Sequence, residues 1–141
     1  MNDIALDERL EADTIPVTEL PLCRVLLMND TRFIWVILVP RQPGVSEVFD
    51  LSTEDQQQLW HETTVLAAAM KASFEGDKIN IATLGNVVSQ LHMHIVVRRQ
   101  DDAAWPGPVW GHGTAEPYTP DQQTSVRAQL LAEIEGLDLG N

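Results

Sequence analysis

One stretch decides the fold: Gln90-Leu91-His92-Met93-His94-Ile95-Val96-Val97. Polar and apolar residues alternate from Gln90 to Ile95, which is the pattern of a β-strand with one buried face. Gln90, His92 and His94 are therefore expected on the same face, with neighbouring side chains about 6.6 Å apart along the strand. This spacing would let both imidazoles contact one phosphate-sized group.

The composition describes a globular chain of 141 residues, 44% of them hydrophobic, and we expect one domain over 1–141. The net charge of −12 argues against general binding of DNA or RNA. Cys23 is the only cysteine, so no intramolecular disulfide can form, and we expect a buried structural thiol. The N-terminus lacks an apolar segment and no run is long enough to cross a bilayer, which predicts a cytoplasmic protein without membrane contact.

The hydrophobic pattern predicts a chain that contains both helices and strands. In order, the expected elements are a helix at 3–12, a connector at 13–21, strands at 22–28 and 33–39, a helix at 53–74, strands at 78–84 and 90–98, and a helix at 120–135. The loop at 101–120 is rich in Trp, Pro and Gly. Its Trp105 and Trp110 either cover a cleft, contact a partner chain, or pin the loop to the surface.

The two strand histidines allow four interpretations: metal ligation, phosphate binding without chemistry, nucleophilic catalysis, or a structural pair. A metal needs three or four ligands, and the sequence has no Cys pair or nearby carboxylates, so we expect no metal site. A neutral imidazole can attack phosphorus near neutral pH, which gives a phosphohistidine-type intermediate. From spacing alone, a hydrogen-bonded structural pair is favoured.

The segment from Gly85 to Val96 resembles the signature of the histidine triad family, His-x-His-x-His followed by apolar residues. The wider frame is also similar, with Asn29 after the first strand, Val39-Pro40 ending the second, and a long helix opening Leu-Ser-x-x-Asp. The resemblance covers a core of about 22–99 and implies an α+β fold with a five-stranded antiparallel sheet, usually in a homodimer. It also implies cleavage of purine nucleotides at the α-phosphate, in phosphoramidates, dinucleoside polyphosphates or adenylates, and no cofactor is expected.

The resemblance assigns roles to individual residues. His92 takes the position of the nucleophile, and His94 that of the histidine that contacts the phosphate. Asn29 takes a ribose-binding position, and Asn86 and Ser89 fall on the loop that reaches the phosphates. The apolar hairpin around Leu26 is expected to line the pocket for the base.

Two positions depart from the family pattern. Gln90 replaces the first histidine of the triad; its amide can still orient a neighbour through hydrogen bonds, but it cannot titrate. Trp35 aligns with a histidine that supports the nucleophile in many members. A hydrolase or nucleotidyl transferase and a nucleotide-binding module with negligible turnover therefore both remain open. His112 is a candidate replacement acid if its loop folds over the site, and Arg98 is expected to be solvated.

Overall fold

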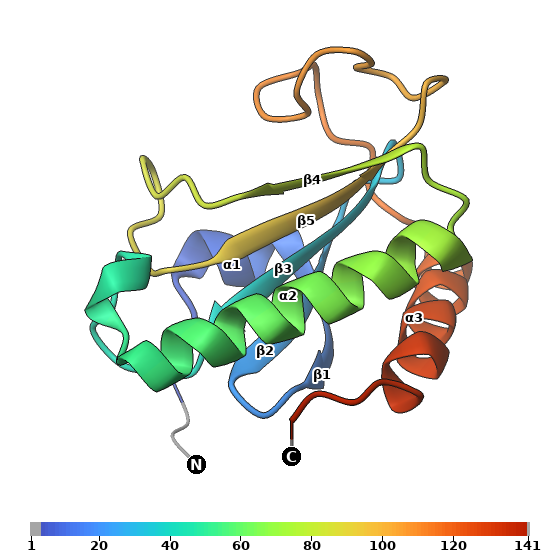
Figure 1. Cartoon of the computed structure of the whole chain (residues 1–141). Coiled ribbons are helices and arrows are strands. Elements are labelled where there is room, and N and C mark those ends of the chain that lie inside the picture. Colours follow the sequence, from blue (N-terminus) through green and yellow to red (C-terminus); the bar gives the residue numbers. More distant parts are fainter. Residues whose placement is uncertain (1–3, 141) are drawn as a thin grey trace.

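The structure, a computed structural model, describes residues 4–140 and contains one five-stranded antiparallel sheet (Figure 1). The elements are α1 (Glu8–Asp13), β1 (Thr14–Glu19), β2 (Cys23–Met28), β3 (Ile34–Pro40), the 3-10 helix η1 (Val48–Asp50), α2 (Thr53–Ser73), β4 (Lys78–Ala82), β5 (Met93–Arg98) and α3 (Pro120–Glu135). The strands follow the order β1-β2-β3-β5-β4. The expected α+β fold is confirmed. No helix within 4–140 is both long and apolar enough to cross a membrane.

Alternating side chains of the central strands belong to two separate hydrophobic cores, one on each face of the sheet. On one face of the sheet, Val36 and Leu38 of β3 pack with residues of α2 and α3. On the other face, Trp35 and Ile37 pack with Leu10 of α1 and with residues of the 101–118 segment. The long helices therefore cover one face, while α1 and a loop cover the other, as Figure 1 shows. The second face is less completely covered by regular structure, and the candidate site lies there.

The strand β1 was not expected, because Pro16 and Pro21 suggested an irregular connector. β1 is an edge strand, where a proline is tolerated because one side of the strand needs no hydrogen-bond donors. Its register with β2 shifts between Pro16 and Thr18, so the strand is irregular at the proline. The expected helix at 3–12 is also shorter: α1 begins after Asp7, which caps it, and Asp3 lies outside the described residues.

The strand β5 begins at Met93, three residues later than the alternation of Gln90 to Ile95 predicts. Gln90 and His92 consequently belong to the segment that enters the strand, and only His94 lies within the ladder. The segment from 83 to 92 joins β4 to β5 as an extended loop rather than a tight turn. Gly85 has φ of +79°, a conformation that favours glycine, and helps the loop to turn.

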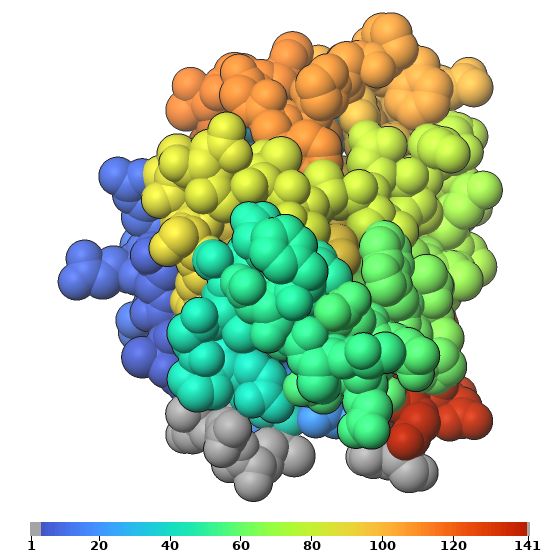
Figure 2. Space-filling view, turned by 60° about the vertical axis from the view of Figure 1, so that its left-hand side comes forward, coloured from blue at the N-terminus to red at the C-terminus, as the bar shows by residue number. Residues whose placement is uncertain are grey.

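The 101–118 segment is held down by a buried ion pair at the end of β5. Arg98 is 2% exposed, and its guanidinium binds Asp102 at 2.8 Å as well as the Asn80 side chain and the Gly107 carbonyl. The expectation that Arg98 is solvated was therefore wrong, because the loop folds back over it. Figure 2 shows this segment (orange) lying directly above the 83–90 loop (yellow).

Candidate active site

A cavity of about 370 Å³ opens on the sheet face that carries α1, beside the start of β5. This volume is within the range of about 300–1,000 Å³ that is common for small-molecule sites. Its lining comes from α1, the first hairpin, the 83–90 loop, the two histidines and the tip of the 101–118 segment. The residues are Arg9, Leu10, Asp13, Thr14, Met28, Trp35, Ile37, Leu84, Gly85, Asn86, Val87, Val88, His92, His94, Trp110 and Gly111.

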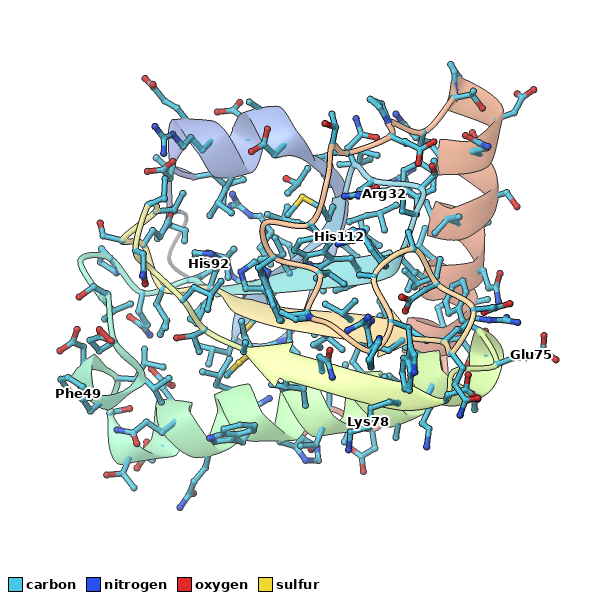
Figure 3. The ribbon with its side chains drawn as sticks, turned by 90° about the horizontal axis from the view of Figure 1, so that it is seen from above. Arg32, Phe49, Glu75, Lys78, His92 and His112 are labelled. Carbon is cyan, nitrogen blue, oxygen red and sulfur yellow. The ribbon has the colours of Figure 1, made fainter. Side chains whose placement is uncertain are left out.

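His92 is oriented by the backbone beside it. Its Nδ1 lies 2.7 Å from the carbonyl oxygen of Gln90. A carbonyl oxygen can only accept, so Nδ1 carries the proton of the neutral ring and Nε2 keeps its lone pair. His92 is 6% exposed and lines the cavity. The arrangement thus provides an imidazole whose Nε2 keeps a lone pair for nucleophilic attack. Figure 3 shows His92 beside the start of β5.

His94 is held in the complementary state by Trp35. The indole Nε1 of Trp35 lies 3.0 Å from Nδ1 of His94, and the indole N–H can only donate. Nδ1 of His94 is therefore the acceptor, and Nε2 carries the proton. The rings of His92 and His94 meet edge to face, with centroids 4.8 Å apart. The site therefore pairs one imidazole that offers a lone pair with another that offers an N–H.

The pKa of His94 is lowered to about 3, mainly because burial disfavours the charged ring and also because of the neighbouring His92. His94 is consequently neutral at physiological pH and acts as a hydrogen-bond donor rather than a general acid. A neutral donor beside a nucleophile can stabilise charge that develops on a phosphoryl oxygen. Within residues 4–140, no three His, Cys, Asp or Glu side chains come together in a group that could hold a metal ion.

Comparison with protein families matches residues 9–101 to the HIT domain. The chain belongs to the histidine triad (HIT) family. This family consists typically of nucleotide-binding hydrolases and transferases. Comparison with curated protein sequences gives no match.

Solved structures of histidine triad proteins resemble this HIT protein over nearly its full length. One from Marinobacter aquaeolei VT8 is 52% identical with a TM-score of 0.92, covering 95% of this chain and 98% of that one. One from Sinorhizobium meliloti 1021 is 47% identical with a TM-score of 0.90, covering 92% and 96% respectively. One from Bradyrhizobium japonicum is 42% identical with a TM-score of 0.90, covering 92% and 97%.

Gln90 does not line the cavity with the two histidines of this HIT protein. Its side-chain Oε1 accepts a hydrogen bond from the Asp7 backbone at 2.7 Å, and its Nε2 donates to the Ala5 carbonyl at 3.0 Å. Leu91, Met93 and Ile95 pack together in the core that α2 covers, as the expected alternation requires, but the Gln90 side chain is engaged by the segment that leads into α1 and is not part of the cavity lining. Gln90 still orients His92, but through its backbone carbonyl and not through its amide.

The other expected binding residues are divided among different places in the HIT fold. Asn86 lines the cavity with the histidines, whereas Ser89 lines a different hollow beside the N-terminal segment. The side-chain oxygen of Asn29 accepts from the Tyr118 backbone at 2.9 Å, and Asn29 faces a third hollow. Leu26 is fully buried in the second core and is not a wall of the cavity.

His112 also lies away from the two histidines. It lines the third hollow, and its carbonyl accepts a hydrogen bond from Arg32 at 2.7 Å; Figure 3 shows it towards Arg32 on the 101–118 segment. Trp110 instead packs against His94, with ring centroids 5.4 Å apart, so this tryptophan forms a wall of the cavity. The sequence offered the Trp-rich loop as a possible cover but could not tell which of its aromatic residues reaches the site.

Arg9 and Leu10 were not expected in the site. Both belong to α1, which reaches the cavity because Gln90 ties the preceding segment to the start of β5. Met28 and Ile37 form the apolar wall that was assigned to Leu26. The alternation of β3 could have indicated that Trp35 and Ile37 share a face, but the alignment of β3 with β5 is a tertiary feature.

Proposed function

We propose that this HIT protein is a nucleotide-binding hydrolase or nucleotidyl transferase that acts at an α-phosphate through His92. The observation that carries the proposal is the His92 ring, whose Nδ1–H is bound to the Gln90 carbonyl while the ring lines a cavity next to a neutral donor, His94. Attack by Nε2 forms an N–P bond as the bond from phosphorus to the leaving group breaks. Water or a second acceptor then takes the nucleotidyl group from His92.

The remaining walls suit a nucleoside monophosphate unit. Leu10, Met28 and Ile37 offer an apolar surface for a purine base, and the loop with Gly85 and Asn86 offers backbone and amide groups for phosphate oxygens. His94 donates from Nε2 to a non-bridging oxygen and does not supply the leaving group's proton, which comes from solvent. The substrates proposed are nucleoside phosphoramidates, dinucleoside polyphosphates and adenylates.

The experiment is an assay of AMP release from adenosine phosphoramidate and from diadenosine polyphosphates. His92→Ala is expected to lose on the order of 10³-fold in kcat or more, because the nucleophile is removed. The matched control is His61→Ala, which removes an exposed histidine of α2. Trapping an adenylyl group on His92 by mass spectrometry would support the mechanism, whereas unchanged turnover by His92→Ala would exclude it.

A nucleotide-binding module with negligible turnover is the second candidate. It is favoured by the side chains of Gln90 and Trp35, because neither can titrate and the Gln90 amide is engaged by the N-terminal segment. Calorimetry with AMP separates the two candidates. Binding without AMP release from any of the substrates above would support the module, and AMP release that depends on His92 would overturn it.

We also propose that the protein forms a homodimer. Within the described residues β4 pairs only with β5, so its other edge presents free backbone donors and acceptors that can pair with a second copy. Trp60 on α2 and Leu84 just beyond β4 are each 48% exposed, which adds apolar surface for a partner. Light scattering after size exclusion is expected to give twice the chain mass, and a monomer mass at micromolar concentration would overturn this proposal.

A further inference from the structure

We propose that Trp35 is a positioning residue for the reaction above: its indole N–H fixes His94 in one tautomer and so keeps Nε2–H directed at the phosphoryl group. The inference rests on the proposed function for its catalytic consequence. The tautomer itself is a property of the folded protein and can be measured without substrate.

The first support is the chemistry of the bond. Trp35 Nε1 and His94 Nδ1 are 3.0 Å apart, and both side chains are more than nine-tenths buried. An indole has one N–H and no acceptor, so the bond forms only when Nδ1 of His94 has no proton. Loss of this bond would leave a buried indole N–H without a partner, so the other tautomer of His94 is disfavoured.

The second support is the strand register. Ile37 of β3 lies opposite His94 of β5, and Trp35 lies opposite Val96. Trp35 and His94 are therefore diagonal neighbours on one face, a separation that an indole ring spans. The alignment of β3 with β5 thus determines which histidine the indole reaches, and it is His94 rather than the nucleophile His92.

The third support is the aromatic packing that restrains both rings. Trp110 packs edge to face on Trp35 and on His94, with ring centroids 5.9 Å and 5.4 Å apart, and Phe33 packs edge to face on Trp35 with centroids 6.3 Å apart. Such edge-to-face contacts stabilise each ring pair beyond the effect of burial. The indole and imidazole therefore have little freedom to rotate out of hydrogen-bonding geometry.

The consequence is a donor that does not change with pH. Protonation of His94 at Nδ1 would place two N–H groups against each other, and burial opposes it as well. The charged or titratable groups that line the same cavity are His92, next to β5, and Arg9 and Asp13 of α1; β3 and the 101–118 segment contribute no charged lining. His94 therefore remains a hydrogen-bond donor throughout.

The test uses Trp35→Phe, which keeps an aromatic ring and removes the N–H. Two-dimensional ¹H–¹⁵N spectra of the histidine rings are expected to show Nε2–H and a bare Nδ1 for His94 in the wild type. In Trp35→Phe they are expected to show a mixture of tautomers. A wild-type His94 with Nδ1–H, or a tautomer unchanged in the variant, would overturn the inference. Trp60→Phe, on the exposed face of α2, is the matched control and should leave the spectra as they are.

Activity provides the second readout. Trp35→Phe is expected to lower kcat on the order of 10-fold with little change in KM, because the His94 donor acts on charge that develops in the transition state. Trp35→His, which can donate again from a ring N–H, should recover part of the loss and also guards against a variant that merely folds poorly. Absence of recovery in a folded Trp35→His would count against positioning. If the wild type turns over none of the substrates, the proposed function fails with the catalytic part of this inference, and the spectra still decide the tautomer.

Discussion

Gln90 holds Asp7 across the edge of the candidate site: the side-chain oxygen of Gln90 accepts a hydrogen bond from the Asp7 backbone N–H at 2.7 Å. The amide nitrogen of the same side chain donates to the Ala5 carbonyl, and the backbone carbonyl accepts from His92. One residue therefore joins the segment that leads into α1 to the orientation of the proposed nucleophile. This dual attachment leads to the first prediction.

Gln90→Ala is expected to release the segment before α1 and to lower stability by about 1–2 kcal/mol, because two backbone groups lose their partner. Hydrogen exchange should increase at Ala5 to Leu10 more than elsewhere, since these residues depend on the Gln90 amide. Gln57→Ala is the control, because Gln57 is exposed on α2 and makes no side-chain hydrogen bond with the described residues. Unchanged exchange at Ala5 to Leu10 would contradict the proposed attachment.

Arg9→Gln is expected to weaken the binding of nucleotides on the order of 5-fold, measured by calorimetry with AMP. Arg9 lines the cavity of a protein with a net charge of −12, and its guanidinium makes no ion pair with the residues that the structure describes. One exposed charge interaction with a phosphate corresponds to about 1 kcal/mol. Lys78→Gln removes the same charge at the start of β4, far from His92 in Figure 3, and should bind AMP as the wild type does. Equal effects of the two variants would show that only net charge matters.

Asp102→Ala is expected to destabilise the protein by roughly 3 kcal/mol, because it leaves the buried Arg98 without its carboxylate. Asp101→Ala is the matched control: it removes the neighbouring acid, whose ion pair with Arg99 is exposed, and should have little effect. Chemical denaturation measures both variants. Similar losses would mean that the Arg98 pair does not hold the 101–118 segment as proposed.

Protonation of Asp102 at low pH is expected to destabilise the 101–118 segment. Burial alone would raise the pKa of Asp102, but hydrogen bonds from Arg98 and from three backbone N–H groups outweigh it and lower the pKa to about 2. The folded pKa is below the unfolded value of about 3.9, so this stabilisation is present above pH 4 and is lost as pH falls towards 2. Tryptophan fluorescence of the wild type should report the loss in that window, and Asp102→Ala should not show it.

The lowered pKa of His94 makes the stability of the protein depend on pH in a second, higher range. Its pKa is about 3 in the folded protein and about 6.5 in the unfolded chain, so the unfolded state binds the extra proton between these values. Stability should therefore fall as pH is lowered from 6.5, by at most about 1.4 kcal/mol per pH unit from this group. Urea unfolding between pH 6.5 and pH 5 measures the slope above the range where carboxylates titrate. His94→Gln should flatten the slope and His61→Gln should keep it, and a slope common to both would contradict the assignment.

Cys23 is expected to resist thiol reagents in the native protein. Burial, and then the carboxylate of Glu62, raise the pKa of the Cys23 thiol well above its usual value, so little thiolate forms at pH 8. Labelling should be complete in urea and negligible without it over the same time. An exposed thiol introduced as Ser125→Cys on α3 should label rapidly in the native protein. Fast native labelling of Cys23 itself would contradict the structure of β2.

Sequence patterns were sufficient where a local rule acts alone. The capped start of α2 at Ser52, the Thr119-Pro120 start of α3, and the hairpin of β2 and β3 all follow from residue preferences within a few positions. The buried thiol of Cys23 followed from its apolar neighbours. β1 could not be predicted in this way, because its proline is acceptable only at a sheet edge, and being an edge is a property of the assembled sheet.

By itself the sequence determined that His92 and His94 lie close together, because spacing along a chain fixes distances between near neighbours. The motif from Gly85 to Val96 also indicated the histidine triad family, which the comparison of residues 9–101 with the HIT domain confirmed. Only the tertiary structure decided the partners of these rings. Trp35 reaches His94 through the register of β3 with β5, and the Gln90 side chain binds the Asp7 backbone because the segment that leads into α1 packs beside it. Hydrogen bonds between residues more than 50 positions apart depend on how strands and helices pack, and that packing is set by the whole core rather than by any one segment.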